Sequence, residues 1–239
     1  MSKIVVKNLQ KFYGKKHVVK GLNLEINTGE VVGILGPNGA GKTTSFYMII
    51  GITRPNNGSI TLDGKDITHL PMHERGSLGI GYLPQEPSIF RGLNVEDNIM
   101  AILELVQKDK TMRKQKLNEL LEEFHIEHLR KQSSISLSGG ERRRLEIARL
   151  LALNPKFVFL DEPFAGVDPV SVIDINNLIK HLTSKNIGVI ITDHNVRETL
   201  KITNRTYIIY EGRVLTEGTQ EEILAHEETR KYYLGESFV

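Results

Sequence analysis

The chain has 239 residues, of which 39% are hydrophobic and 25% are charged, a composition that suits one substantial core and excludes a large multi-module protein. Its net charge of +2 is too small for the basic surface that binds phosphate backbones, so we expect no nucleic acid partner. No cysteine is present, which excludes disulfides and thiolate metal sites.

The N-terminal stretch MSKIVVKNLQ lacks the apolar core of a signal peptide. Apolar runs such as VVGIL and FVFL are far shorter than the ~20 residues that cross a bilayer. We therefore expect a cytoplasmic protein, and any role in transport would require another subunit to span the membrane.

Residues 3–30 alternate apolar and polar side chains in pieces such as LNLEI, which is the period of half-exposed strands. This pattern predicts an antiparallel β layer. Tyr13 lies in this β layer, before the first glycine-rich loop in the chain. Its ring either stacks on an adenine base or simply fills the layer.

The continuously apolar run 31–35 predicts a strand covered on both faces, and it leads directly into GPNGAGKTT. This loop has the phosphate-loop spacing between a strand and a helix. Backbone N–H groups of the loop would point at the β-phosphate, Lys42 would reach the β and γ oxygens, and Thr43 would hold Mg²⁺. The predicted nucleotide-binding residues of the loop are Gly36, Pro37, Asn38, Gly39, Ala40, Gly41, Lys42, Thr43 and Thr44.

Residues 58–67 read as a short hairpin, and residues 79–86 read as a buried strand that ends at Gln85. Two interpretations of Gln85 remain open. It contacts Mg²⁺ or water and couples that contact to the helical segment that follows, or it is only a polar strand terminus. From about residue 93 to residue 129 the apolar period becomes helical, as Leu117, Leu120, Leu121 and Phe124 illustrate. We predict one domain over 1–239 with a helical subdomain at approximately 90–155.

A strand and helix rhythm returns after residue 137. We predict helices at 139–152, 169–183 and 195–201, strands at 157–160 and 188–192, a closing hairpin at 206–218 and a last helix at EEILAH. Alternating strands and helices imply right-handed crossovers and a mainly parallel sheet. The fold class is therefore α/β, of the phosphate-loop NTPase type, with an N-terminal antiparallel β layer.

Three polar residues follow the core strands. FVFL carries Asp161 to a strand end, where a carboxylate can bind Mg²⁺, and Glu162 comes next, where it can orient and polarise an attacking water. His194 follows the strand GVIIT and should lie at the same edge of the sheet. We predict Glu162, His194 and Gln85 as catalytic residues and Thr43, Gln85 and Asp161 as metal-facing residues.

The order of the phosphate loop, Gln85, LSGGE, FVFLDE, AGVD and His194 resembles the ATP-binding cassette superfamily over essentially the whole chain. The resemblance implies that two chains face head to tail and that Ser138, Gly139 and Gly140 of one close on the ATP held by the other. Asp168 in AGVD matches the loop that crosses between subunits. From the residues alone, Ser138 and Asp168 can also be interpreted as helix N-caps.

Two details accompany this second glycine-rich loop. Glu141 stands where the superfamily usually has glutamine, so we assign that side chain no direct nucleotide role. The basic run 142–144 is most simply the solvated face of the helix that follows.

Longer stretches such as LNPKFVFLDEPFAGVDPVSVIDI and ITDHNVRETL resemble the ATPase subunits of bacterial lipopolysaccharide exporters. This implies a homodimer on the cytoplasmic face of the inner membrane, beneath the membrane subunits LptF and LptG with the single-span protein LptC. A short helix of a membrane subunit would dock beside Gln85, with Phe90 and Arg91 as candidate contacts, unless Phe90 belongs to the core. Tyr232, Tyr233 and Phe238 pack either on the partner chain or on their own domain.

Three other classes of protein remain as alternatives. The nearest is the ATPase of a branched-chain amino acid importer, which shares the DEPFAG stretch. A soluble cassette protein of DNA repair or translation usually needs two cassettes, coiled coils or zinc cysteines. A GTPase should carry an Asn-Lys-x-Asp base reader, and NPKF does not match it.

Overall fold

The computed structural model describes residues 1–235, except for the side chains of residues 169–171. Phe238 therefore lies outside the described residues. Within 1–235, no helix is both long and apolar enough to pass through a membrane.

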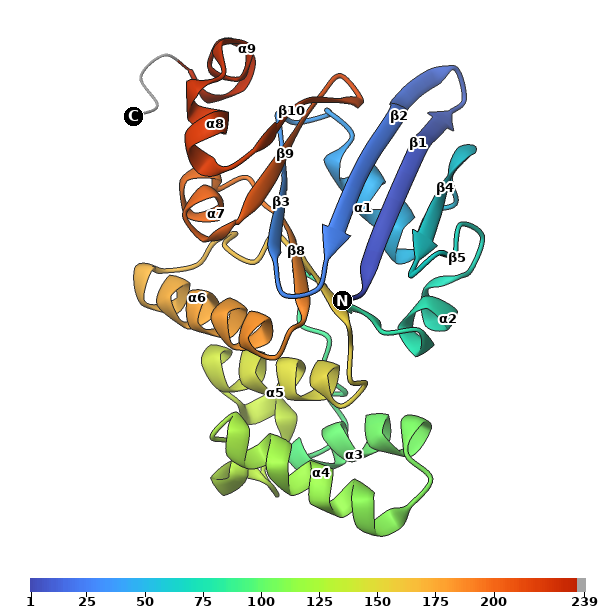
Figure 1. The fold of residues 1–239 in the computed structure, drawn as a ribbon. Helices are drawn as coiled ribbons and strands as arrows, with labels where there is room; N and C mark the ends of the chain where they lie inside the picture. The colour runs from blue at the N-terminus through green and yellow to red at the C-terminus, as the bar shows by residue number, and fades with distance from the viewer. Residues whose placement is uncertain (236–239) are drawn as a thin grey trace.

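One of the two sheets is antiparallel, as predicted, with strand order β2-β1-β4-β5 (Figure 1). Register shifts interrupt the pairing of its two long strands, and such irregularities bend and twist the strands locally. Its strands are β1 (Lys3–Tyr13), β2 (Lys16–Asn27), β4 (Asn57–Leu62) and β5 (Lys65–Asp66).

The second sheet is parallel through five strands and has one antiparallel edge strand, in the order β10-β9-β3-β8-β7-β6. This confirms the predicted α/β fold class. Its strands are β3 (Val31–Leu35), β6 (Ile80–Leu83), β7 (Phe157–Asp161), β8 (Gly188–Thr192), β9 (Arg205–Tyr210) and β10 (Arg213–Gly218). β6 ends two residues before Gln85, because Pro84 has no N–H group to continue the ladder.

The helices α3 and α4 lie at the end of the molecule remote from α8 and α9 (Figure 1). The sequence did not predict the helix at Met72–Ser77, because six residues are too few for a readable period. The α-helices are α1 (Lys42–Ile50), α2 (Met72–Ser77), α3 (Val95–Val106), α4 (Lys110–Glu123), α5 (Gly139–Leu151), α6 (Pro169–Ser184), α7 (Val196–Ile202), α8 (Gln220–Ala225) and α9 (Glu227–Thr229). Short 3-10 turns occupy Glu127–Leu129 and Ser134–Ser136, and a π turn occupies Arg230–Leu234.

The parallel sheet is buried on both faces, as the unbroken apolar run of β7 illustrates. Phe157 and Phe159 pack into the cluster shared with α1 and the antiparallel sheet. Val158 and Leu160, which point the opposite way, pack into the cluster shared with the helices. This two-sided burial fixes the end of β7, and therefore the residues that follow it.

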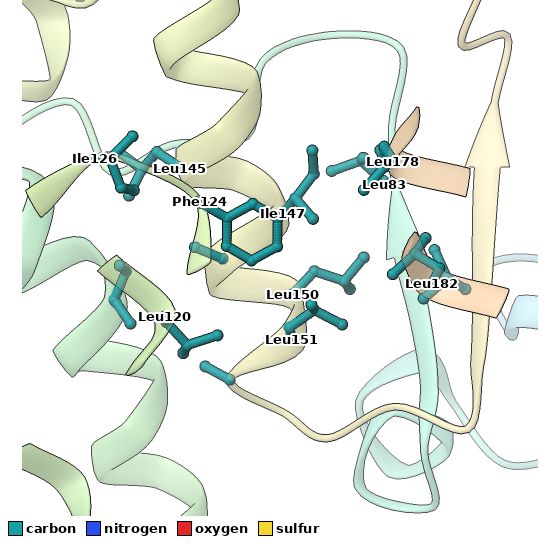
Figure 2. Close-up of a cluster of buried hydrophobic side chains, with 14 of the residues drawn as sticks. Leu83, Leu120, Phe124, Ile126, Leu145, Ile147, Leu150, Leu151, Leu178 and Leu182 are labelled. Carbon is teal, nitrogen blue, oxygen red and sulfur yellow. The ribbon is translucent and has the colours of Figure 1, made fainter. Parts of the chain in front are cut away.

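The helices α3 and α4 and the segment that follows them, residues 95–129, form a helical insert. Helix α5 joins this insert to the core (Figure 2). Leu145 lies toward Phe124 and Ile126 of the insert, while Ile147 lies toward Leu83 and Leu178 of the core. The leucines predicted from the helical period, Leu117, Leu120 and Leu121, are buried in the same cluster. The insert is thus attached through one continuous apolar layer.

Arg75 of α2 is 1% exposed and closes the far end of α1. Its guanidinium donates to the carbonyl oxygens of Met48 and Ile49 in the last turn of α1, at 2.8 and 2.6 Å, and to those of Thr68 and Leu70, at 2.9 and 2.8 Å. Burial lowers the pKa of Arg75 to about 10, so it stays cationic at neutral pH. It neutralises the negative end of the helix that begins at the phosphate loop.

The C-terminal aromatics that the structure describes pack on their own domain. Tyr232 stacks on Tyr210 with ring centroids 5.1 Å apart. Tyr233 packs against the cluster that contains Leu35 and Ile208, and burial raises its pKa to about 12.

Candidate functional site

The first glycine-rich loop connects β3 to α1, and its glycines are required by the backbone. Gly36 has φ of 148°, and a Cβ there would lie 2.0 Å from the carbonyl oxygen of Ile209. Gly41, the N-cap of α1, has φ of 102° and would place a Cβ 2.9 Å from the carbonyl oxygen of Val18. No other residue type fits these two positions without moving the strands behind the loop.

The start of α1 forms an anion-binding surface. The N–H groups of its first turn have no acceptor within the helix and carry the positive end of the helix dipole. Lys42 donates from Nζ to the carbonyl oxygens of Gly36 and Pro37 at 2.6 and 3.0 Å, which holds the ammonium over the loop. An ammonium has three donors, so one is left for a phosphate oxygen. Burial lowers the pKa of Lys42, and the charge of Glu162 counteracts this effect.

Asp161, at the end of β7, is 6% exposed and is held by two phenols that sequence reasoning did not identify. Its Oδ2 accepts hydrogen bonds from the hydroxyls of Tyr47 and Tyr82, each at 3.1 Å. Burial raises the pKa of Tyr82 and the charge of Asp161 raises it further, so that phenol remains a donor. No local sequence signal links these residues, because the contacts span 114 and 79 positions.

Glu162 follows in a left-handed conformation, with φ of 46°. This conformation is unfavourable for a residue with a Cβ and costs about 1–2 kcal/mol. It is maintained by a hydrogen bond from the Glu162 N–H to the carbonyl oxygen of Thr192 at 2.7 Å. The turn directs the chain away from the sheet directly after Asp161 and leaves the Glu162 carboxylate 35% exposed.

His194 lies beside Glu162, as expected from its place at the end of β8. Its Nδ1 is 3.5 Å from Oε2 of Glu162 and 3.8 Å from Oδ1 of Asp193, and its side chain is 61% exposed. Asp193 is a further residue that sequence reasoning missed. It is 1% exposed and accepts hydrogen bonds from the N–H groups of Phe164 and Asn195 at 2.8 and 2.7 Å, tying the segment after Glu162 to the segment around His194.

The second glycine-rich loop is a capped helix start. Ser138 is the N-cap of α5, and its Oγ accepts from the Glu141 N–H at 3.3 Å. Glu141 in turn accepts from the N–H and the hydroxyl of Ser138, both at 2.8 Å, and these two hydrogen bonds lower its pKa. Glu141 therefore serves the cap, and the N-cap interpretation of Ser138 is confirmed. Ser138, Gly139 and Gly140 are exposed.

The basic run after this loop differs from the prediction of a solvated face. Arg144 is exposed, but Arg142 and Arg143 are half-buried. Arg142 donates to the carbonyl oxygen of Leu137 at 3.2 Å, and Arg143 pairs with Glu146 at 3.2 Å. The prediction is wrong for these two residues because α5 packs against both the insert and the core, which leaves little of its surface to solvent.

A cleft of about 640 Å³ gathers several of the predicted residues. Its lining includes Gln85, Glu162, Asp168 and the loop 138–140, and it includes none of the loop 36–44. Within one chain, the serine-glycine loop and the phosphate loop therefore do not line the same cleft. Their roles toward a nucleotide stay predictions.

The remaining predicted residues lie on the surface. Tyr13 is 52% exposed at the end of β1, with Lys11 Nζ 5.2 Å from its ring centroid. Phe90 is 43% exposed and lies under the guanidinium of Arg149, 4.1 Å from the ring centroid, so it is not a core residue. Arg91 lines a hollow of about 230 Å³ together with Pro87, Ile89, Ile135 and Arg142.

The parallel sheet, the glycine loop at the start of α1 and the acidic end of β7 define a nucleotide-binding cassette. Residues 19–165 match the family model described as ABC transporter, and the chain belongs to that family. The structure resembles the ADP conformation of MJ1267, an ATP-binding cassette of an ABC transporter, with a TM-score of 0.86 and 28% identity over 99% of this chain and 100% of that one.

Two further similarities concern a transport system and a dimer. The chain is 56% identical over 239 residues to the lipopolysaccharide export system ATP-binding protein LptB of Escherichia coli strain K12, covering 100% of this chain and 99% of that protein. It also resembles a dimeric structure of a post-hydrolysis state of the cassette MJ0796 bound to ADP and Pi, with a TM-score of 0.76 and 26% identity over 91% of this chain and 98% of that one. The resemblance inferred from the motifs is confirmed.

Proposed function

We propose that this chain is the ATP-hydrolysing subunit of a lipopolysaccharide exporter. It works as a homodimer on the cytoplasmic face of the inner membrane, beneath LptF and LptG with LptC. The observation that carries the proposal is the full-length identity of 56% to LptB, combined with a phosphate loop and an acidic strand end in one site. The same identity favours the exporter over an amino acid importer.

ATP binding is assigned to residues on two elements. The first-turn N–H groups of α1 and the free donor of Lys42 bind the phosphates, and the exposed ring of Tyr13 stacks on adenine. The metal-facing residues fit Mg²⁺, which prefers oxygen ligands and uses one or two carboxylates together with phosphates. Thr43, Gln85 and the buried carboxylate of Asp161 supply such oxygens. When bound, Mg²⁺ neutralises charge on the phosphate oxygens.

Glu162 is the proposed general base. It follows Asp161 directly, and its carboxylate is 35% exposed, so that it can orient a water molecule and accept its proton. His194 lies 3.5 Å from Glu162, at the end of the neighbouring strand β8. From there it can help to hold the reacting phosphate and water. Gln85 lines the same cleft as Glu162 and links it to the helical insert.

The second glycine-rich loop acts on the nucleotide of the partner chain. Ser138 and the N–H groups at the start of α5 form an exposed, capped helix end that attracts anions. This loop and the phosphate loop do not share a cleft within one chain, which favours a role in trans. The similarity to a dimeric cassette supports the same arrangement, and Asp168 is assigned to the crossing between subunits.

The membrane subunits dock at the surface formed by Phe90 and the neighbouring hollow. Phe90 offers a half-exposed ring, and Pro87, Ile89 and Ile135 add apolar surface beside Arg91. A short amphipathic helix with an apolar anchor and an acidic residue fits this combination. Its position close to Gln85 connects partner binding to the nucleotide site.

Affinity purification from membranes tests this proposal. We expect the wild-type chain to recover LptF and LptG, and Phe90→Ala to recover much less of both while its own ATPase activity is retained. Met112→Ala, which removes a 55% exposed apolar side chain elsewhere on the insert, is the matched control and should behave as wild type. Recovery of an amino acid permease in place of LptF and LptG would contradict the export function, and unchanged recovery with Phe90→Ala would contradict the docking surface.

A further inference from the structure

The two carboxylate oxygens of Asp161 have different surroundings. Oδ2 accepts two hydroxyl donors at 3.1 Å, which occupies both of its lone pairs. Among the described residues no hydrogen bond to Oδ1 is present. The two phenols therefore fix the plane of the carboxylate and leave one oxygen for another ligand.

Each phenol comes from an element that carries, or leads directly to, another metal-facing residue. Tyr47 lies four residues after Thr43 in α1, a spacing that brings the two side chains onto the same face of the helix. Tyr82 lies in β6, three residues before Gln85. The two hydrogen bonds to Asp161 thus connect α1, β6 and β7. Thr43 lies in α1, Asp161 ends β7, and Gln85 follows the end of β6.

The rings are held by an aromatic cluster. Tyr47 and Tyr82 meet edge to face, with centroids 6.5 Å apart and an interplanar angle of 80°. Phe46 contacts Tyr82 at 6.3 Å and Phe159 at 5.2 Å, both in edge-to-face geometry. Because the rings are packed in this way, the hydroxyls keep their direction without help from the carboxylate.

We propose that Tyr47 and Tyr82 are positioning residues that hold Asp161 in the orientation needed to bind the metal ion of the nucleotide complex. They set the relative placement of Thr43, Gln85 and Asp161 through one carboxylate oxygen. This inference rests on the proposed binding of Mg²⁺ with ATP and adds two residues that act through Asp161 and do not touch the nucleotide. Without them, Asp161 loses rotational order that metal binding must restore.

The test uses Tyr47→Phe and Tyr82→Phe, which keep the rings and remove only the hydroxyls. Tyr207→Phe is the matched control, since Tyr207 is 1% exposed and its hydroxyl donates to the backbone oxygen of Glu25 at 3.2 Å, away from Asp161. The full chain is titrated with Mn²⁺ in the presence of ATP, and free Mn²⁺ is measured by electron paramagnetic resonance. Nucleotide affinity is measured separately in EDTA with a fluorescent ATP analogue.

We expect each phenylalanine variant to bind Mn²⁺ in the ATP complex roughly tenfold more weakly than wild type, the usual effect of losing a hydrogen bond to a charged group. Binding of the analogue in EDTA and the control variant should be unchanged. Equal or tighter Mn²⁺ binding, with or without a fall in melting temperature, would overturn the proposal and leave the phenols a structural role. If one of the two variants does not fold, the other decides. Failure of the proposed function is distinguishable, because the wild-type chain with ATP would then bind no more Mn²⁺ than ATP alone.

Discussion

Replacing Arg75 with methionine removes the cation that closes α1 while keeping a side chain of similar length. The four backbone oxygens that Arg75 binds would lose their donors inside the core. At about 1 kcal/mol for each buried acceptor left unpaired, the direct loss is about 4 kcal/mol. Relief from burying a guanidinium offsets part of this, so we expect a net loss of about 3 kcal/mol in the free energy of unfolding.

Urea denaturation followed by circular dichroism measures this loss. Arg54→Met is the control, because Arg54 is exposed and its replacement should change stability by less than about 0.5 kcal/mol. A loss below about 1 kcal/mol for Arg75→Met would refute the reasoning that the guanidinium satisfies these oxygens. α1 carries Lys42 and Thr43 at its other end, so the result bears on how the phosphate loop is anchored.

Other substitutions test separate parts of the structure. Glu162→Gln should leave ATP binding intact and lower turnover about 100-fold or more, and retention of more than about a tenth of the rate would exclude it as the base. Gly36→Ala should abolish nucleotide binding in a fluorescence titration, since its Cβ would lie 2.0 Å from a carbonyl oxygen of β9; wild-type affinity would contradict this. Burial raises the pKa of Glu123, but hydrogen bonds from Lys185 and His181 outweigh it and bring the pKa below the usual 4.5. The stability lost in Glu123→Gln should therefore be about 0.5–1 kcal/mol at pH 7 in urea denaturation and vanish as the pH falls below 4.5 through the folded value; a gap independent of pH would contradict this.

Sequence reasoning found the residues whose positions follow from strand ends. Asp161 and His194 each follow an apolar run, and the carboxyl ends of parallel strands meet at one edge of the sheet. His194 is therefore expected at the same edge of the sheet as the end of β7, and in the structure its side chain is 3.5 Å from that of Glu162. The phosphate loop was equally readable, because its spacing is specific and its glycines are required locally.

The residues that sequence reasoning missed depend on contacts between distant segments. Tyr47 and Tyr82 resemble ordinary core aromatics until the packing of α1 on the sheet brings both hydroxyls to Asp161. Arg75 lies in a helix of six residues, too short for a periodic pattern, so its burial had no local signal. The role of Glu141, in contrast, did have a local sequence signal, because the spacing Ser-x-x-Glu predicts the capping box found at α5.

The central claim is that the serine-glycine loop acts across a dimer, and the ATP-dependent mass of the Glu162→Gln chain tests it most directly. Light scattering after size exclusion should give the monomer mass of 27.0 kDa without nucleotide and about twice that mass with ATP. The combined variant Glu162→Gln with Ser138→Arg should bind ATP with unchanged affinity in a fluorescence titration and remain monomeric. A combined variant that still doubles its mass with ATP would contradict the account.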